Sequence, residues 1–134
     1  MNGPSLFRCP LCGSPLTQKE RGCICPARHS FDRAAAGYVH LLPPNRMHSK
    51  APGDDREMVA ARAAFLERGY YAPLRQALEE LVLEASAHLE GPVLLDSGCG
   101  EGYYTAGMFR ALERAGHRPR AAGIDISKYA LRRA

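Results

Sequence analysis

Residues 94–102 carry the sequence LLDSGCGEG, a glycine-rich stretch between an apolar run and a helical pattern. The apolar run, Val93-Leu94-Leu95, is typical of a buried parallel strand. Glycines let the backbone turn sharply and approach a ligand closely. A helical pattern follows from about Tyr104 to Ala115 and is closed by Gly116. The sequence therefore predicts a strand, a glycine turn and a helix in succession.

A second unit of the same kind follows. Residues 121–124 predict another strand that ends at Asp125, and Ser127 can cap a further short helix before Ala134. Alternating strands and helices indicate an α/β fold with a parallel sheet and right-handed crossovers.

Two helices are expected upstream. Asp54 can N-cap the first, with Glu57 as its capping-box partner, and Gly69 ends it. The second begins near Pro73 and ends at Gly91-Pro92. The apolar positions that define the two helices are Met58, Ala61, Phe65 and Leu66 in the first and Leu74, Ala77, Leu78, Leu81, Val82, Ala85 and Leu89 in the second.

Composition excludes several classes of protein. Of the 134 residues, 46% are hydrophobic and 24% are charged, which indicates a globular chain rather than a disordered one. No apolar run approaches the roughly 20 residues that cross a bilayer, and the N-terminus lacks the layout of a signal peptide, so we expect no membrane association. The net charge of +4 is compatible with a nucleic-acid partner without requiring one.

The five cysteines point to metal chemistry. Their odd number and the missing signal peptide argue against a disulfide framework and for a reducing cytoplasm. Cys9, Cys12, Cys25 and His29 form the pattern C-x2-C-x12-C-x3-H, which suits tetrahedral zinc. Four protein ligands leave no open position, so the expected role is structural. Cys23 is a rival to Cys25, with which it would share a strand face.

A redox C-x-x-C is the alternative interpretation of the first cysteine pair. Such a motif usually opens a helix, and the surrounding prolines and glycine do not favour one. We divide the chain into a cysteine-rich, zinc-binding head (residues 1–42), a polar, proline-rich linker (43–54) and an α/β portion (55–134).

The glycine turn predicts a cofactor site. Asp96 can meet a cationic group of a ligand, and Asp125 lies where Rossmann-like folds hold ribose hydroxyls. The dinucleotide fingerprint G-x-G-x-x-G would need glycine at Tyr103. The pattern D-x-G-x-G-x-G instead resembles motif I of class I S-adenosylmethionine-dependent methyltransferases. A purely structural turn without a ligand is the alternative.

The whole chain resembles the large-subunit rRNA (guanine-N1)-methyltransferases, a family that includes a macrolide-resistance branch. The stretches that carry the resemblance are FRCPLCGSPL, CICPARHSFD, GYVHLLP, KAPGDDREMVAARAAFLERGYYAPLR, LLDSGCGEGYYT and GIDISKYAL. The resemblance implies a zinc-bearing RNA-recognition module before a Rossmann-like catalytic domain. It also implies methyl transfer from S-adenosylmethionine to N1 of a guanosine in a 23S rRNA hairpin.

The resemblance also assigns residues. Cys9, Cys12, Cys25 and His29 fall on the family's zinc ligands, Gly100 and Glu101 on its motif I contacts, and Tyr71 on a tyrosine that reaches the cofactor. An ordinary helix-cap tyrosine is the alternative for Tyr71. The expected cofactor-binding set, including the residues argued from the turn itself, is Tyr71, Asp96, Gly98, Gly100, Glu101, Gly102 and Asp125.

One departure from the family is large. Its catalytic domain carries a seven-stranded sheet, whereas this chain ends after the second strand, so we expect a truncated or split reading frame and assign no catalytic base. If the 134-residue chain itself were active, an oligomer such as a homodimer, or another partner, would have to supply the missing strands. The alternative functions are a non-catalytic zinc-ribbon module that binds RNA or protein, with a vestigial tail, and a small-molecule methyltransferase.

Overall fold

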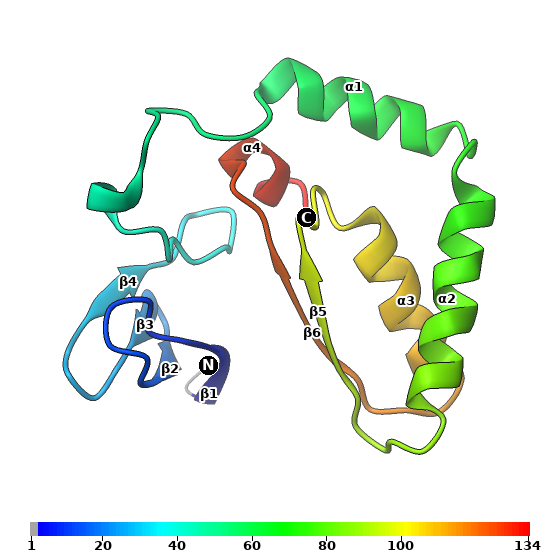
Figure 1. Cartoon of the computed structure of the whole chain (residues 1–134), viewed down its shortest axis with the longest axis horizontal. Helices are drawn as coiled ribbons and strands as arrows, with labels where there is room; N and C mark the ends of the chain where they lie inside the picture. Colours follow the sequence, from blue (N-terminus) through cyan, green and yellow to red (C-terminus); the bar gives the residue numbers. More distant parts are fainter. Residues whose placement is uncertain (1–2) are drawn as a thin grey trace. The chain divides into compact units, whose positions relative to one another are not determined.

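The computed structural model describes residues 3–134, which form two compact units that divide between Pro52 and Gly53 (Figure 1). The first unit is a small antiparallel sheet and the second is a parallel α/β arrangement. The expectation of an α/β chain with a zinc-ribbon-like N-terminal module is confirmed at this level.

The first unit is a four-stranded meander. Its strands pair with their neighbours in chain order, and each pair is antiparallel. The strands are β1 (Gly3–Arg8), β2 (Pro15–Lys19), β3 (Gly22–Ile24) and β4 (Ser30–Asp32).

The core of this unit is small. Its buried residues are Cys9, Leu16, Cys23, Cys25 and Phe31, so three of the five are cysteines. A segment of this size buries too little apolar surface to be stable without a further constraint. The remaining part of the unit holds one turn of 3-10 helix, η1 (Pro44–Arg46).

The second unit contains one parallel strand pair, β5 (Val93–Ser97) and β6 (Arg120–Ile124). The helix α3 (Tyr103–Arg114) connects them, which confirms the predicted strand–helix–strand order. The short helix α4 (Lys128–Leu131) follows β6 and is capped by Ser127, whose hydroxyl accepts from the N–H of Ala130.

Two longer helices precede β5, namely α1 (Arg56–Glu67) and α2 (Ala72–Ser86). The predicted cap of α1 was wrong. Asp55 caps it, and its carboxylate accepts from the N–H of Met58 at 2.9 Å. Asp54 instead pairs with Arg62. With the cap moved by one residue, Glu57 no longer stands at the capping-box position.

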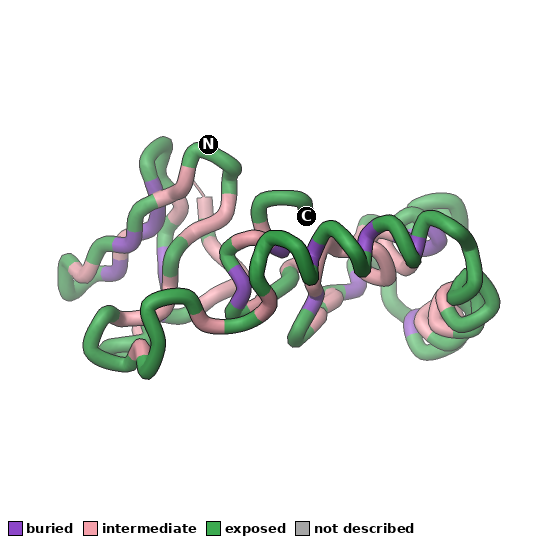
Figure 2. The backbone as a smooth tube through the Cα atoms, turned by 90° about the horizontal axis from the view of Figure 1, so that it is seen from above, coloured by how far each residue is buried: buried purple, intermediate pink, exposed green. Residues whose placement is uncertain are grey.

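The apolar side of α1 also differs from the prediction. Val59, Ala63 and Leu66 are the buried residues, whereas Met58 and Phe65 are exposed. Figure 2 shows that buried stretches of the chain are short and separated by exposed ones. Of the predicted positions only Leu66 is buried. The helix is apolar on more than one side, so its composition alone does not decide which side packs.

In α2 the predicted stripe is only partly covered. Leu78 and Val82 are half-buried, while Leu81 is 60% exposed. The helix packs along α3. The helix also ends at Ser86, before the Gly91-Pro92 stop that the sequence suggested.

The parallel sheet has an exposed apolar side. Val93 and Leu95 alternate along β5 and are 60% and 62% exposed. Ile124 and Ile126, at and just after the end of β6, are exposed as well. Monomeric proteins seldom leave such strand residues open to water.

Candidate functional site

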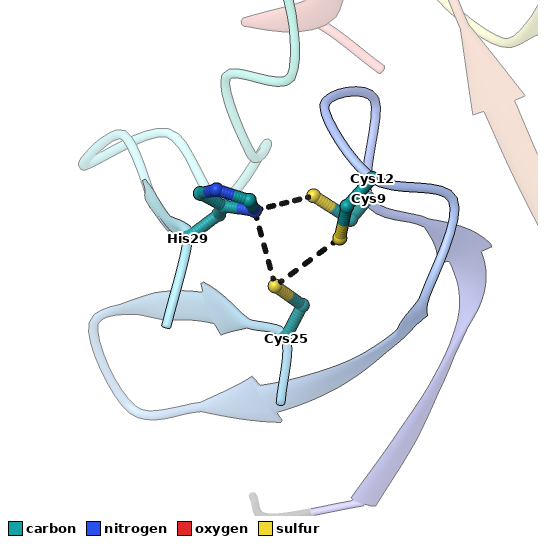
Figure 3. A group of neighbouring side chains, drawn as sticks. All are labelled: Cys9, Cys12, Cys25 and His29. Carbon is teal, nitrogen blue, oxygen red and sulfur yellow. Dashed lines mark hydrogen bonds between the residues drawn. The ribbon is translucent and has the colours of Figure 1, made fainter. Parts of the chain in front are cut away.

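Four potential metal ligands converge in the first unit (Figure 3). Cys9 and Cys12 lie in the loop between β1 and β2, and Cys25 and His29 lie between β3 and β4. The ligand atoms of these four residues all lie within 4.8 Å of one another. The structure therefore brings together the whole predicted set of zinc ligands.

The distances within this group fit a zinc tetrahedron. Ligands at about 2.3 Å (sulfur) and 2.0–2.1 Å (nitrogen) are separated by about 3.8 Å between two sulfurs and about 3.6 Å between sulfur and nitrogen. The two sulfurs of Cys12 and Cys25 are 3.7 Å apart. Nδ1 of His29 lies 3.5 Å from the sulfur of Cys9 and 3.4 Å from that of Cys25.

Each of the two loops is closed by a backbone hydrogen bond to the carbonyl of its first cysteine. The N–H of Gly13 donates to the carbonyl of Cys9 at 2.8 Å, and the N–H of Arg28 donates to that of Cys25 at 2.9 Å. Gly13 and Arg28 both have a positive φ, of 71° and 68°. Arg28 is the one non-glycine residue with this conformation among residues 3–134, and it sits between two ligands.

Local interactions prepare one thiol for metal binding. Hydrogen bonds from the hydroxyl and the N–H of Ser14 lower the pKa of Cys12 to about 6. Burial raises the pKa of Cys25 instead. The thiolate is the form that binds a metal, so the lowered pKa favours metal binding by Cys12 at neutral pH.

Cys23 lies outside the metal group. Its side chain is buried in the small core, and it pairs in register with Phe31 of β4. Cys25 follows β3 directly, where the chain has left the strand and turns toward His29.

The glycine turn joins β5 to α3. Gly98, Gly100 and Gly102 have φ angles of 79°, 57° and 83°, values that favour glycine. A Cβ atom added to Gly98 or Gly100 would meet no atom within 4 Å. The space beside these two residues is therefore open.

Three consecutive N–H groups tie this turn to the end of β6. Those of Gly98 and Cys99 donate to the carbonyl of Ile124, at 2.8 and 3.0 Å. That of Gly100 donates to Oδ2 of Asp125 at 2.9 Å. Oδ1 of Asp125 accepts from the N–H of Ser127 at 2.7 Å.

Asp96, near the end of β5, accepts a hydrogen bond from the hydroxyl of Thr105 in the first turn of α3. Sequence reasoning did not select Thr105. A hydroxyl residue one helical turn beyond a glycine turn is the signal that could have indicated it, because it faces back toward the strand end.

The other two predicted cofactor residues are Glu101, within the turn, and Tyr71, at the start of α2. The carboxylate of Glu101 pairs with Arg133 at 3.3 Å. Tyr71, at the start of α2, stacks edge-on against Phe65 and is 45% exposed. Burial, and then the nearby side chains of Tyr103 and Tyr71, raise the pKa of Tyr104.

Cys99 is the fifth cysteine. Burial, and then the negative charges of Asp125 and Asp96, raise the pKa of its thiol. It therefore stays protonated at neutral pH, which disfavours a nucleophilic role.

Comparison with known proteins finds similarity in both parts of the chain. Residues 7–50, which span the metal group, match the zinc-ribbon family described as "RlmA, N-terminal". The whole chain is similar to 23S rRNA (guanine-N1)-methyltransferases. It is 39% identical to the 23S rRNA (guanine(748)-N(1))-methyltransferase of Streptomyces fradiae, over 128 residues and 96% of this chain.

Two further relatives carry the provisional name 23S rRNA (guanine-N(1)-)-methyltransferase. The protein of Micromonospora griseorubida is 39% identical over 96% of this chain, and YxjB of Bacillus subtilis is 35% identical over 92%. The chain spans less than half the length of these relatives, from 43% to 46%.

None of the helices within residues 3–134 has the length and apolar character needed to cross a membrane.

Proposed function

We propose that this chain provides the zinc module and the cofactor-binding turn of an S-adenosylmethionine-dependent methyltransferase. Its target is N1 of a guanosine in a hairpin of 23S rRNA. The observation that carries the proposal is the similarity to named rRNA methyltransferases over 92–96% of the chain, which covers both the metal group and the glycine turn.

The proposed zinc ligands are Cys9, Cys12, Cys25 and His29, with a structural role. Their spacing in space matches the edges of a zinc tetrahedron, and all four positions are filled by protein atoms. Binding of the ion supplies the stability that the small core of this unit lacks.

The proposed cofactor site is the open side of the glycine turn. Its residues are Tyr71, Asp96, Gly98, Gly100, Glu101, Gly102 and Asp125. The open space beside Gly98 and Gly100 supports close approach of a ligand to the backbone. One free lone pair on each carboxylate oxygen of Asp125 suits ribose hydroxyls.

The hydrogen bonds of the turn favour S-adenosylmethionine over a dinucleotide. A dinucleotide places its pyrophosphate on free N–H groups at the start of the helix. Here the N–H groups of Gly98, Cys99 and Gly100 are bonded to the end of β6, and that of Gly102 to the carbonyl of Cys99. Tyr103 also replaces the third glycine of the dinucleotide fingerprint.

When bound, the cofactor supplies an electrophilic methyl group for in-line attack by the guanine nitrogen. The residues of this chain contribute to the reaction by orienting the cofactor: the turn and the two aspartates hold it beside the strand ends. N1 of guanine is protonated at neutral pH, so the reaction needs a base. Residues 3–134 offer none that we assign to that role.

RNA contacts are proposed for the first unit. Its basic side chains can neutralise phosphates, and RNA hairpins are recognised through their loops and phosphates. The alternative is an ordinary solvated surface. The basic residues in question are Arg8, Lys19, Arg21, Arg28, Arg33, Arg46 and Lys50.

The remaining assignments follow from these. Residues 1–42 form the RNA-recognition module, 43–54 the linker, and 55–134 the start of a Rossmann-like methyltransferase domain. We place the protein in the cytoplasm, where thiols stay reduced. The exposed apolar residues of β5 support a homodimer when no further polypeptide covers them.

A chimera tests the proposed function. Residues 1–134 replace the corresponding part of the Streptomyces fradiae relative, and transfer of a labelled methyl group to 23S rRNA is measured. We expect methylation at guanine N1. The matched variant Gly100→Val should lose it while it retains zinc, because a β-branched residue is strained at a φ of 57°.

Two outcomes would contradict the proposal. Equal activity of the Gly100→Val chimera would show that the turn does not bind the cofactor. A folded, zinc-loaded chimera that binds rRNA without methylating it would favour the non-catalytic zinc-ribbon alternative, and activity on metabolites alone would favour a small-molecule methyltransferase.

A further inference from the structure

Asp125 makes two backbone hydrogen bonds that a ribose-binding role does not require. Oδ2 accepts from the N–H of Gly100, and Oδ1 accepts from the N–H of Ser127. One bond reaches back 25 residues into the glycine turn, and the other closes the connection from β6 to α4. Hydrogen bonds to a charged acceptor are the stronger kind.

The second bond is part of a longer chain of contacts. Ser127 is 2% exposed, and its hydroxyl donates to the carbonyl of Asp54 at 2.6 Å while it accepts from the N–H of Ala130. Asp54 immediately precedes Asp55, the cap of α1. The carboxylate of Asp125 thus links the turn to the starts of α4 and α1.

The other carboxylate at the strand ends does not duplicate this role. The hydrogen bond that Asp96 accepts comes from the Thr105 hydroxyl and not from the backbone of the turn. Of residues 3–134, Asp125 is the one whose side chain accepts a hydrogen bond from a backbone N–H of the turn. It does so while one lone pair on each oxygen remains available.

We infer that Asp125 is a positioning residue for the glycine turn, which it holds in its open shape before any cofactor arrives. The inference rests on the proposed function only for the identity of the ligand that the turn would bind. Without the carboxylate, the N–H of Gly100 loses its acceptor, and the turn is held at Gly98 and Cys99 alone.

Amide hydrogen exchange of the cofactor-free 134-residue chain tests this inference. In Asp125→Ala we expect exchange at Gly100 and Ser127 to accelerate roughly tenfold or more, as for the loss of a charge-assisted hydrogen bond. Gly98, bonded to Ile124, should keep its rate. The matched control is Asp54→Asn, which changes a nearby carboxylate that pairs with Arg62 and should leave Gly100 unchanged.

An unchanged rate at Gly100 in Asp125→Ala would overturn the inference. Equal acceleration at Gly98, Gly100 and the buried Leu112 would overturn it too, since that describes general destabilisation. If the variant does not fold, the hydrogen bond is tested in the wild-type chain by NMR. We expect a scalar coupling across the bond from the Gly100 N–H to the Asp125 carboxylate, and its absence would refute the inference. All these measurements omit the cofactor, so failure to bind S-adenosylmethionine would not affect them.

Discussion

At the scale of single residues, two cysteines that are neighbours in sequence have different surroundings. Cys23 lies within β3, opposite Phe31, and fills the small core. Cys25 lies just beyond the strand, 3.7 Å from the sulfur of Cys12 and 3.4 Å from Nδ1 of His29. Strand alternation predicts both sulfurs on one side, but Cys25 lies beyond the end of β3, and only its sulfur belongs to the metal group.

This difference predicts opposite results for two matched variants. Cys25→Ser should reduce zinc from about one ion per chain to a small fraction, because the tetrahedron loses a thiolate. Cys23→Ser should retain zinc and lose about 1–3 kcal/mol of stability, since it buries a hydroxyl in an apolar core. Elemental analysis and denaturant unfolding measure the two effects. Zinc lost from Cys23→Ser and kept by Cys25→Ser would mean that the ligand assignment is wrong.

The sequence predicted which residues come together in the metal group but not the cap of α1. The strict spacing of Cys9, Cys12, Cys25 and His29 predicted a group that the structure does bring together. The cap of α1 was misplaced because Asp54 and Asp55 are chemically equal. Their contacts distinguish them: the Asp54 side chain pairs with Arg62 and its carbonyl accepts from Ser127, which leaves Asp55 to cap the helix.

At the scale of elements, order and type were predictable but packing was not. The strands β5 and β6 and the helix between them follow from short apolar runs, glycines and caps. For α1 and α2 the composition offers apolar residues on several sides. Which side becomes buried depends on the neighbours that are present, as the 60% exposure of Leu81 illustrates.

Two leucines of the second unit should therefore respond differently to truncation. Leu112 on α3 is fully buried, and Leu112→Ala should cost about 2–5 kcal/mol through lost burial and the cavity left behind. Leu81→Ala on α2 makes the same chemical change at an exposed position and should stay within about 0.5 kcal/mol. Denaturant unfolding monitored on the second unit distinguishes them. A comparable loss in both would show that a partner surface covers Leu81 in solution.

At the scale of the whole molecule, the sheet of the second unit is covered unevenly. Contacts from α3 reach both strands, while Val93 and Leu95 stay open to solvent. The relatives that the chain matches are more than twice as long. Sequence patterns predicted the parallel strand pair. They indicate which residues are apolar but not which neighbour covers them, so the contacts of the exposed side could not be predicted.

The last prediction concerns residues 1–134 on their own. In the proposed site, the glycine turn, Asp125 and Tyr71 would contact only part of a cofactor of this size, so binding would hardly offset the freedom of motion that the ligand loses. We expect weak or no binding of S-adenosylmethionine by calorimetry and no methyl transfer, while zinc is retained. The chimera with the Streptomyces fradiae relative should bind the cofactor, and Asp96→Ala in it should weaken that binding without loss of zinc. Methylation of a 23S rRNA hairpin by the purified 134-residue chain would contradict this, and would require a second copy or another partner to complete the sheet.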